Sequence, residues 1–529
     1  MRRDLFLSDW RQVRRYAVPA RMIAACTDAR ERGDWRAACA AARIDVDPGV
    51  TDDAPVAHLA PDLLRWHLPR ALHGSTAFTE GVLYLLIPDE PVGPETVLLT
   101  VRSPDTAASP QRLRLGVVRG AADLRGGRAV PVPAYLWDAR HTGGLRAALG
   151  GSADRLPLLT ATGEAVPEES LGLGDDLAAR AERVWRAPTR REAFAAAGFE
   201  FAPGQDGAWR SADHSWPLQD LDPLRLAHET RWLAARLGER TWVVWQHFYR
   251  HLRVVVEPGD VVRISLVSDH GMKPGTADEP PGTRIAMVRF AADLELIRQG
   301  RLKPGALHPL VRDALFPGAP ADLFRPTDGE LVRVRCNGVW HEIEARLGRL
   351  DPLAHTVDER QRERAMRAFG GAVTGCFAVE QLWYGALGRL PRQLRAYRNE
   401  LWQHLVHGGT DTLLELLDTG LDPHLRDSAG GTLIHRIAAF DHRELLPRLL
   451  AAGVGIDTVD KEGNSALHRI VVQYGPADVI TTLVDAGANP RIRNRGGHTV
   501  LDHAKRMAGY DRLRPDFRRA LDHLRKHAR

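Results

Sequence analysis

The segment WQHFYRH places His247 and His251 four residues apart, so that both imidazoles could share one face of a helix. Histidines at this spacing begin the zinc site of one class of metalloprotease, in which a glutamate directly after the first histidine is the general base. Phe248 stands at that position, and two histidines are too few ligands for a zinc site. The segment therefore indicates an amphipathic surface or core packing rather than a metal site.

Two further histidines are each followed by a glutamate, in the pairs His228-Glu229 and His341-Glu342. Such pairs could supply metal ligands or a general acid and base, but nothing in the sequence brings them together. We therefore predict no metal, no cofactor and no assigned catalytic residue. The residues kept as candidates for chemistry are His228, Glu229, His247, His251, His341 and Glu342.

Several enzyme signatures are missing from the sequence. A P-loop requires a Gly-Lys dipeptide, and the chain has none. The G-x-S-x-G elbow of hydrolases is also missing, and no H-x-E occurs together with the P-C-x-x-C that a zinc deaminase needs. The four cysteines, Cys26, Cys39, Cys336 and Cys376, show no C-x-x-C spacing, so the sequence suggests neither a zinc knuckle nor a disulfide framework. Reduced thiols in the cytoplasm are expected.

The elements that must position these residues alternate between helical and strand patterns. We expect an α+β body of mixed helices and short antiparallel strands, divided into a helical segment with a linker over 1–56, a lobe over 57–201, a linker over 202–222 and a second lobe over 223–395. Apolar runs predict strands at 82–87, 96–101 and 112–118. The Asn337-Gly338 pair predicts a hairpin over 331–345, and a long helix is expected over 358–388.

Length, composition and charge limit the number of domains and the kinds of partner that the sequence allows. At 529 residues the chain is too long for one core, and 44% apolar residues are enough to fill several. No apolar run approaches the 18 residues of a membrane span, so we expect a soluble protein with no membrane partner. Residues 491–529 carry 12 Lys/Arg against 4 Asp/Glu, which favours either a solvated closing helix or a docking patch for an acidic partner or nucleic acid.

The C-terminal quarter repeats itself with one period. Gly430, Gly463 and Gly497 are 33 and 34 residues apart, and the same intervals separate His435, His468 and Asp502. Gly420, Gly453 and Gly487 end the Leu-rich segments LLDTG, LLAAG and LVDAG at these intervals too. Three columns with one period indicate stacked units of two helices, because one such unit cannot bury its apolar face alone.

This pattern, over roughly 396–529, resembles the ankyrin-repeat family, and about four units including atypical caps are expected. The resemblance implies that the histidines tie each turn to the next repeat. The residues given structural roles in the repeat are Gly430, Thr432, His435, Gly453, Gly463, Ser465, His468, Gly487, Gly497 and Thr499. The family's proline and alanine beside the histidine are replaced here, by Leu433 and Ile437 in one unit, which predicts wider helix packing.

The resemblance also implies which positions face a partner. On the loops that join successive repeats, called finger loops here, they are Ser428, Ala429, Gly431, Lys461, Glu462, Asn464, Arg495, Gly496 and His498, and on the first helices Ala439, Phe440, Val472 and Gln473. Phe440 is the best anchor candidate, because aromatic residues are enriched at binding hot spots. The alternative is that Phe440 packs between helices.

These observations predict a non-enzymatic adaptor that docks a protein partner through its repeats. One alternative is an enzyme or toxin-like effector with an active site in 57–395 that the repeats recruit to its target. Another is a nucleic-acid binder that uses the C-terminal arginines. Only five lysines accompany 67 arginines, as GC-rich codons produce, and the segments around 20–73 are similar to uncharacterised actinobacterial proteins, so a bacterial source is expected.

Overall fold

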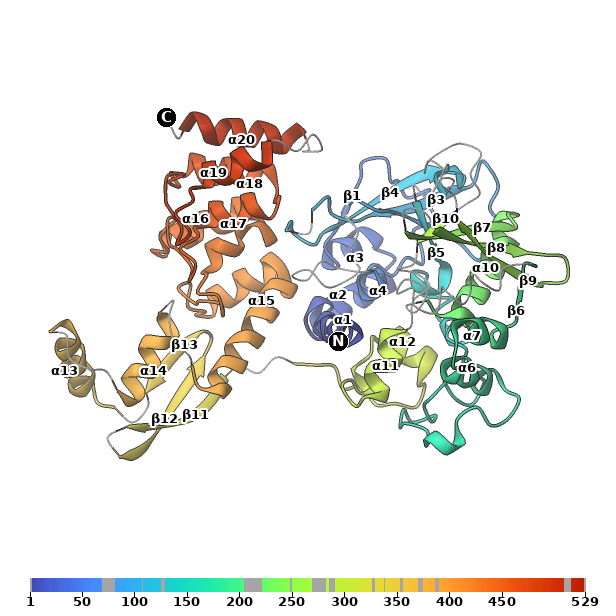
Figure 1. The fold of residues 1–529 in the computed structure, drawn as a ribbon, viewed down its shortest axis with the longest axis horizontal. Coiled ribbons are helices and arrows are strands. Elements are labelled where there is room, and N and C mark those ends of the chain that lie inside the picture. Colours follow the sequence, from blue (N-terminus) through green and yellow to red (C-terminus); the bar gives the residue numbers. More distant parts are fainter. Residues whose placement is uncertain are drawn as a thin grey trace. The chain divides into compact units, whose positions relative to one another are not determined.

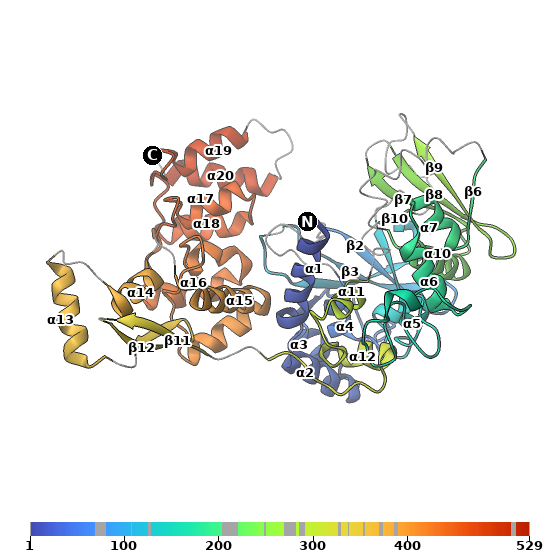
Figure 2. The ribbon, with the colours of Figure 1, turned by 60° about the horizontal axis from the view of Figure 1, so that its bottom comes forward.

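The computed structural model forms two compact units (Figures 1 and 2). The first consists of Met1–Pro104 and Arg112–Arg325, and the second of Asp105–Gln111 and Pro326–Arg529. The structure describes residues 2–68, 81–106, 108–124, 129–203, 221–247, 250–268, 282–284, 291–325, 329–336, 338–352, 355–369, 374–385, 390–508 and 515–527. No helix among these residues is long and apolar enough to cross a membrane.

The first unit begins with the helices that the sequence predicted, broken by proline and glycine. They are α1 (Arg2–Gln12) with a π-helical turn over Val13–Ala17, α2 (Ala20–Glu31), α3 (Trp35–Ala41) and α4 (Pro61–His67). Pro19 precedes α2, and Gly33 lies at φ 74° just before α3. The Asp34 side chain accepts a hydrogen bond from the Ala37 N–H and so caps α3.

A first sheet of mixed pairing follows, with strand order β1-β4-β3-β2-β5. Its strands are β1 (Ile44–Val46), β2 (Leu83–Ile87), β3 (Val97–Arg102), β4 (Leu113–Arg119) and β5 (Ala129–Pro133). The three strands expected at 82–87, 96–101 and 112–118 are β2, β3 and β4, which pair antiparallel as predicted. The outer strands β1 and β5 pair parallel to their neighbours.

The second sheet has the order β10-β7-β8-β9-β6. Its strands are β6 (Phe199–Phe201), β7 (Thr241–His247), β8 (Arg250–Val256), β9 (Val262–Ser268) and β10 (Gly282–Arg284). The remaining main helices of the first unit are α5 (Gly144–Ala148), α6 (Leu177–Arg186), α7 (Arg190–Ala196), α10 (Pro223–Leu237), α11 (Ala292–Arg298) and α12 (Pro309–Leu315), of which α7 and α10 contact the second sheet. Leu85 and Leu98 of the first sheet share one core with Trp242 of the second. The expected lobes 57–201 and 223–395 therefore do not coincide with the compact units, and most of the expected linker 202–222 lies outside the described residues.

The second unit opens with a three-stranded antiparallel sheet of β11 (Gly329–Cys336), β12 (Val339–Arg346) and β13 (Arg349–Pro352). Cys336 pairs with Val339, so the predicted hairpin has the expected two-residue loop, of which Asn337 lies outside the described residues. The single helix expected over 358–388 is instead two helices, α13 (Val357–Ala368) and α14 (Gly375–Tyr384). Thr374, just before α14, has an extended backbone with φ −131°, which ends any continuous helix.

Four helix pairs follow, as the repeat predicted. The first is α15 (Arg392–Asp418), which Gly409 divides in two at φ 74°. The others are a 3₁₀ helix η7 (Leu433–Ala439) with α16 (His442–Ala451), α17 (Ala466–Val472) with α18 (Ala477–Asp485), and α19 (Val500–Ala508) with α20 (Pro515–His527). Gly420, Gly453 and Gly487 follow the second helices at φ between 83° and 105°, which only glycine adopts at little cost.

The sheet of β11–β13 covers the first helix pair, and we call residues 329–385 the cap module. Figure 1 shows β11 beside α15, and α14 packs against β11 and β13. The Asp422 N–H donates to the Leu347 carbonyl at 2.9 Å, and the Trp383 indole donates to the Gly348 carbonyl at 2.7 Å. One apolar core runs from Val332 of the sheet to the last repeat. The cap module and the repeats therefore share one apolar core.

We expect Trp383→Ala to lower the free energy of unfolding by about 3–5 kcal/mol, because it opens a large cavity and leaves the Gly348 carbonyl without its donor. Trp383 is 1% exposed, whereas Trp340 in the same module is 64% exposed. Trp340→Ala is the matched control and should change stability by no more than about 0.5 kcal/mol. Denaturant unfolding followed by circular dichroism checks both values, and equal effects would contradict the assigned role.

Candidate functional site

The histidine of each repeat joins its own turn to the next repeat. The Nδ1 atom of His435 accepts a hydrogen bond from the Thr432 N–H at 3.0 Å. Its Nε2 atom lies 3.0 Å from the carbonyl oxygen of Asn464, 29 residues further along, and donates to it. Both bonds require the neutral imidazole with the proton on Nε2. The structural role that the resemblance implied for His435 is therefore visible in its contacts.

The next repeat has the same two hydrogen bonds, whereas the repeat of Asp502 keeps only the local one. His468 accepts from the Ser465 N–H at 3.2 Å and donates from Nε2 to the His498 carbonyl at 3.2 Å. In the last repeat Asp502 accepts from the Thr499 N–H at 2.9 Å, which keeps the local cap. An ionised carboxylate has no proton to donate to a further unit.

A buried ion network adds a second connection between repeats. The Arg469 guanidinium contacts Asp427 of the preceding repeat at 3.2 Å and Asp460 of its own at 2.9 Å. Burial alone would raise the pKa of Asp427, but Arg469 and Arg436 hold this pKa below its ordinary value. Asp427 also accepts from the backbone of its own finger loop, at Gly431, and so fixes the loop's shape. Asp427 and Asp460 share the 33-residue period and form a further column of the repeat, which the sequence-based prediction missed.

Backbone hydrogen bonds join the finger loops into one row. The Lys461 N–H donates to the Ala429 carbonyl at 2.9 Å, and the Arg495 N–H donates to the Glu462 carbonyl at 2.8 Å. Gly463 sits so close to the next finger loop that an added Cβ would lie 2.9 Å from the Arg495 nitrogen. The row is therefore a continuous surface whose backbone is held in place before any partner arrives.

Most of the expected partner-facing positions lie on this outer surface. Exposed among them are Ser428, Ala429, Glu462, Val472, Gln473, Arg495, Gly496 and His498, while Lys461, Asn464 and Ala439 are half-buried. Gly431 is buried behind Arg469. Val472 is 49% exposed and lies next to Gln473 at the end of α17.

Phe440 does not lie on this surface. Its side chain is 0% exposed and belongs to the apolar core of the repeats. The expectation of an aromatic anchor at Phe440 is corrected accordingly, because the ring packs inside and contributes to stability. This is the alternative that the sequence left open.

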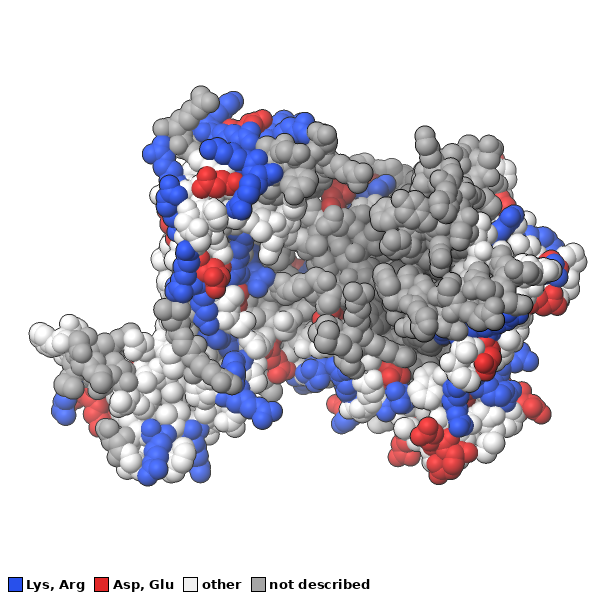
Figure 3. Space-filling view, in the orientation of Figure 1, with Lys and Arg blue, Asp and Glu red and all other residues white. Residues whose placement is uncertain are grey.

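Basic side chains lie along the surface of the repeat stack. In Figure 3, Lys and Arg succeed one another along the repeat stack with few acidic residues between them. Lys461, Arg493 and Arg495 belong to the finger loops, where Lys461 and Arg493 also donate to the loop carbonyls of Ser428 and Gly497. The row therefore presents positive charge from side chains whose positions are partly fixed.

The candidates for chemistry in the first unit do not form one site. His247 and His251 lie on adjacent antiparallel strands, where Trp245 pairs with His251, so the two do not share a helix face. On α10, Glu229 is buried and pairs with Arg225 at 3.0 Å, one helical turn earlier. Burial, assisted by Arg225, lowers the pKa of His228 to about 4.

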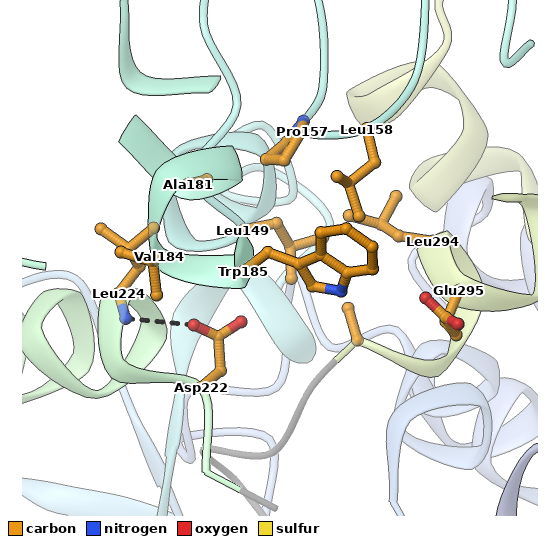
Figure 4. A pocket seen from close by; sticks show the side chains of 11 residues that line it. Leu149, Pro157, Leu158, Ala181, Val184, Trp185, Asp222, Leu224, Leu294 and Glu295 are labelled. Atoms are coloured by element: carbon orange, nitrogen blue, oxygen red, sulfur yellow. Dashed lines mark hydrogen bonds between the residues drawn. The ribbon is translucent and has the colours of Figure 1, made fainter. Parts of the chain in front are cut away.

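A small apolar pocket in the first unit holds no candidate for chemistry either (Figure 4). Trp185 and leucines form most of its wall, and its two carboxylates, Asp222 and Glu295, are already engaged. Asp222 accepts from the Leu224 N–H at 3.0 Å and caps α10, while Glu295 pairs with Arg298 at 2.6 Å.

The third candidate pair lies in the cap module. Glu342 is in an exposed ion pair with Arg333 at 3.3 Å on the outer face of β12. His341 lies on the inner face and meets His355, with the Nδ1 atom of one ring 3.0 Å from the Nε2 atom of the other. Cys336 and Cys376 complete a group of four whose potential ligand atoms all lie within 4.8 Å of one another. The sequence did not reveal this group, because its members are separated by 4, 13 and 20 residues and no short motif contains them.

We expect Arg469→Ala to lower the free energy of unfolding of the repeats by about 3 kcal/mol, because it leaves two buried carboxylates without their shared cation. Arg443→Ala, which removes an exposed arginine from α16, is the control and should stay within about 0.5 kcal/mol. Denaturant unfolding of the full chain measures both changes. A loss as small as the control's would show that the network is not stabilising.

Acid should weaken the repeats through His435. Burial, together with the neighbouring Arg469, lowers the pKa of this histidine to about 4, from about 6.5 in the unfolded chain. The unfolded state therefore takes up a proton first, so stability is complete above pH 6.5 and falls as the pH approaches 4. The full effect is about 3 kcal/mol.

Unfolding free energies of the wild type and His435→Gln, measured between pH 7.5 and 4.5, check this expectation. The loss of stability on acidification should be smaller in the variant, since the other titrating groups are common to both proteins. Equal losses would contradict it.

Residues 401–507 match the family model of ankyrin repeats, in three copies. Curated relatives include SH3 and multiple ankyrin repeat domains protein 1 of Homo sapiens, 33% identical over 109 residues that make up 20% of this chain and 5% of that protein. Synphilin-1 of Mus musculus is 37% identical over 79 residues, 14% of this chain and 8% of that protein. The chain thus spans less than a tenth of the length of these relatives, and the likeness concerns the repeats. The period, the histidine bonds and the family match agree that residues 401–507 are ankyrin repeats.

Proposed function

We propose that the protein is an adaptor that docks a protein partner on the finger loops of its repeats. Ankyrin repeats are in general protein-binding modules. The proposal rests mainly on the row of finger loops, which backbone hydrogen bonds join to one another. A surface that is already ordered loses little conformational entropy when a partner binds.

The partner surface proposed here has a polar part and an apolar part. The finger loops supply the polar part, with Ser428, Lys461, Glu462, Arg495 and His498. The end of α17 supplies the apolar part through Val472, followed by Tyr474, which is 43% exposed. An apolar contact within a polar rim is the usual composition of a protein interface.

The charge of this surface favours an acidic partner segment. Lys461, Arg493 and Arg495 outnumber the one exposed acid of the finger loops, Glu462. Complementary charge raises the rate of encounter and selects among partners. The four cysteines are free and buried, which supports placing this interaction in the reducing cytoplasm.

Reversing charge on the finger loops tests the proposal. We expect Lys461→Glu combined with Arg495→Glu to weaken binding of the partner by about tenfold or more, because attraction to an acidic segment becomes repulsion. Arg443→Glu combined with Arg519→Glu makes the same change of charge at exposed positions of α16 and α20, and it should leave binding unchanged.

The measurement is capture of the partner by the full chain from a native lysate, followed by titration with the purified partner. Both variants should unfold at the wild-type temperature. Equal capture by both variants would contradict the proposed surface. Loss of capture after nuclease treatment of the lysate would instead favour the nucleic-acid alternative.

A further inference from the structure

Two thiols and two imidazoles meet inside the cap module. Cys336 ends β11, His341 lies on β12, His355 follows β13, and Cys376 is in the first turn of α14. Cys336, His355 and Cys376 are buried, and His341 is half-buried. The four come from β11, β12, α14 and the segment before α13, so their meeting depends on the folded module and not on their order in the chain.

We propose that Cys336, His341, His355 and Cys376 form a structural zinc site. Zinc in structural sites takes four protein ligands in a tetrahedron, with Zn–S of about 2.3 Å and Zn–N of about 2.0–2.1 Å. These bond lengths require ligand atoms roughly 3.3–3.8 Å apart. The observed group, with all ligand atoms within 4.8 Å and the two imidazole nitrogens 3.0 Å apart, needs only small shifts to take the ion.

The ligand types select the metal. Thiolate and imidazole ligands favour zinc over magnesium or calcium, which prefer oxygen. Four protein ligands leave no open position for water or substrate, so the site stabilises the fold and performs no reaction. As the ion binds, each thiol loses its proton to solvent and becomes a thiolate ligand.

Groups around the four ligands support the same assignment. Glu359 of α13 has a carboxylate oxygen 3.7 Å from Nδ1 of His355, on the side of the ring opposite the Nε2 atom that faces His341. A carboxylate behind a metal-bound imidazole orients the ring and increases its basicity. Cys376 lies in the first turn of the ten-residue helix α14, which places its sulfur within 4.8 Å of the other three ligand atoms.

Neither a disulfide nor a simple hydrogen bond accounts for the whole geometry. A disulfide between Cys336 and Cys376 would leave the convergence of the two histidines without a cause. A hydrogen bond between His341 and His355 alone would not explain why the two thiols lie beside the imidazoles. A single ion accounts for all four positions, and it would tie α14 to the hairpin of β11 and β12 beneath the first repeat. The inference does not depend on the proposed partner surface.

The test uses the full chain without a polyhistidine tag, purified without chelators. Elemental analysis by plasma mass spectrometry should find about one zinc ion per chain. Cys336→Ser and Cys376→Ser should each reduce the zinc content to a small fraction of this value. Chelation of the wild type should lower its melting temperature, and added zinc should restore it.

Matched controls separate this site from other cysteines and histidines. Cys39→Ala removes a buried thiol of the first unit and should keep the zinc content unchanged. His523→Ala should also keep it, since His523, His527 and Asp485 form a second, more exposed group that could hold a metal. Zinc that disappears with His523→Ala and remains in Cys376→Ser would overturn the proposal.

A measurement on the wild type alone covers the case in which the cysteine variants do not fold. Replacement of zinc by cobalt(II) should give the thiolate charge-transfer bands and the strong visible bands of tetrahedral sulfur and nitrogen coordination. Wild-type protein that binds neither zinc nor cobalt after reduction and reconstitution would overturn the site. So would a Cys336–Cys376 disulfide, found by mass spectrometry, in freshly isolated protein without metal.

Discussion

The arginine at position 469 holds the carboxylates of two successive repeats, and the regularity of the finger loops depends on this contact. Asp427 and Asp460 each use one oxygen for Arg469 and the other for the amides of their own finger loop. The ion pair thus transmits the position of one finger loop to the next. The histidine hydrogen bonds have the same effect. Each one joins the imidazole at the start of a helix to a backbone carbonyl of the next repeat. Each repeat has little core of its own, so the rigidity of the stack depends on these ion pairs and hydrogen bonds between repeats.

The cap module covers the apolar face of the first repeat at the N-terminal end of the stack. The first helix of an array presents an apolar face with no preceding repeat to cover it. Here β11 and α14 cover that face, where the indole of Trp383 stacks on Tyr397 of α15 and the backbone of Gly348 lies against Leu421 and Leu425. A small sheet therefore replaces the polar outer helix with which repeat arrays usually end. At the other end α20 closes the stack through Phe517 and Leu521, while its outward positions are polar.

The sequence predicted the repeats well, because each residue of the period has a local reason for its type. Glycine is needed where φ is positive, a hydroxyl where amides must be capped, and histidine where one side chain must both accept and donate. Predictions that depended on contacts distant in sequence did less well. The buried position of Phe440 depends on the neighbouring helices, and the meeting of Cys336 with Cys376 depends on the whole cap module. The spacing of His247 and His251 allowed a shared helix face, but they lie on β7 and β8, and the segment TWVV at the start of β7 has the β-branched and aromatic residues of a strand.

The aspartate at position 502 stands where the two preceding repeats have a histidine. Its repeat keeps every local bond of the turn, but the atom that would reach forward is an acceptor where His435 and His468 have a donor. A further repeat placed after α20 would bring its loop carbonyl opposite this carboxylate, with no proton between the two oxygens. A histidine at 502 would restore the donor with which His435 and His468 reach the next repeat, so the change from histidine to aspartate keeps the local cap and removes only the hydrogen bond that leads forward.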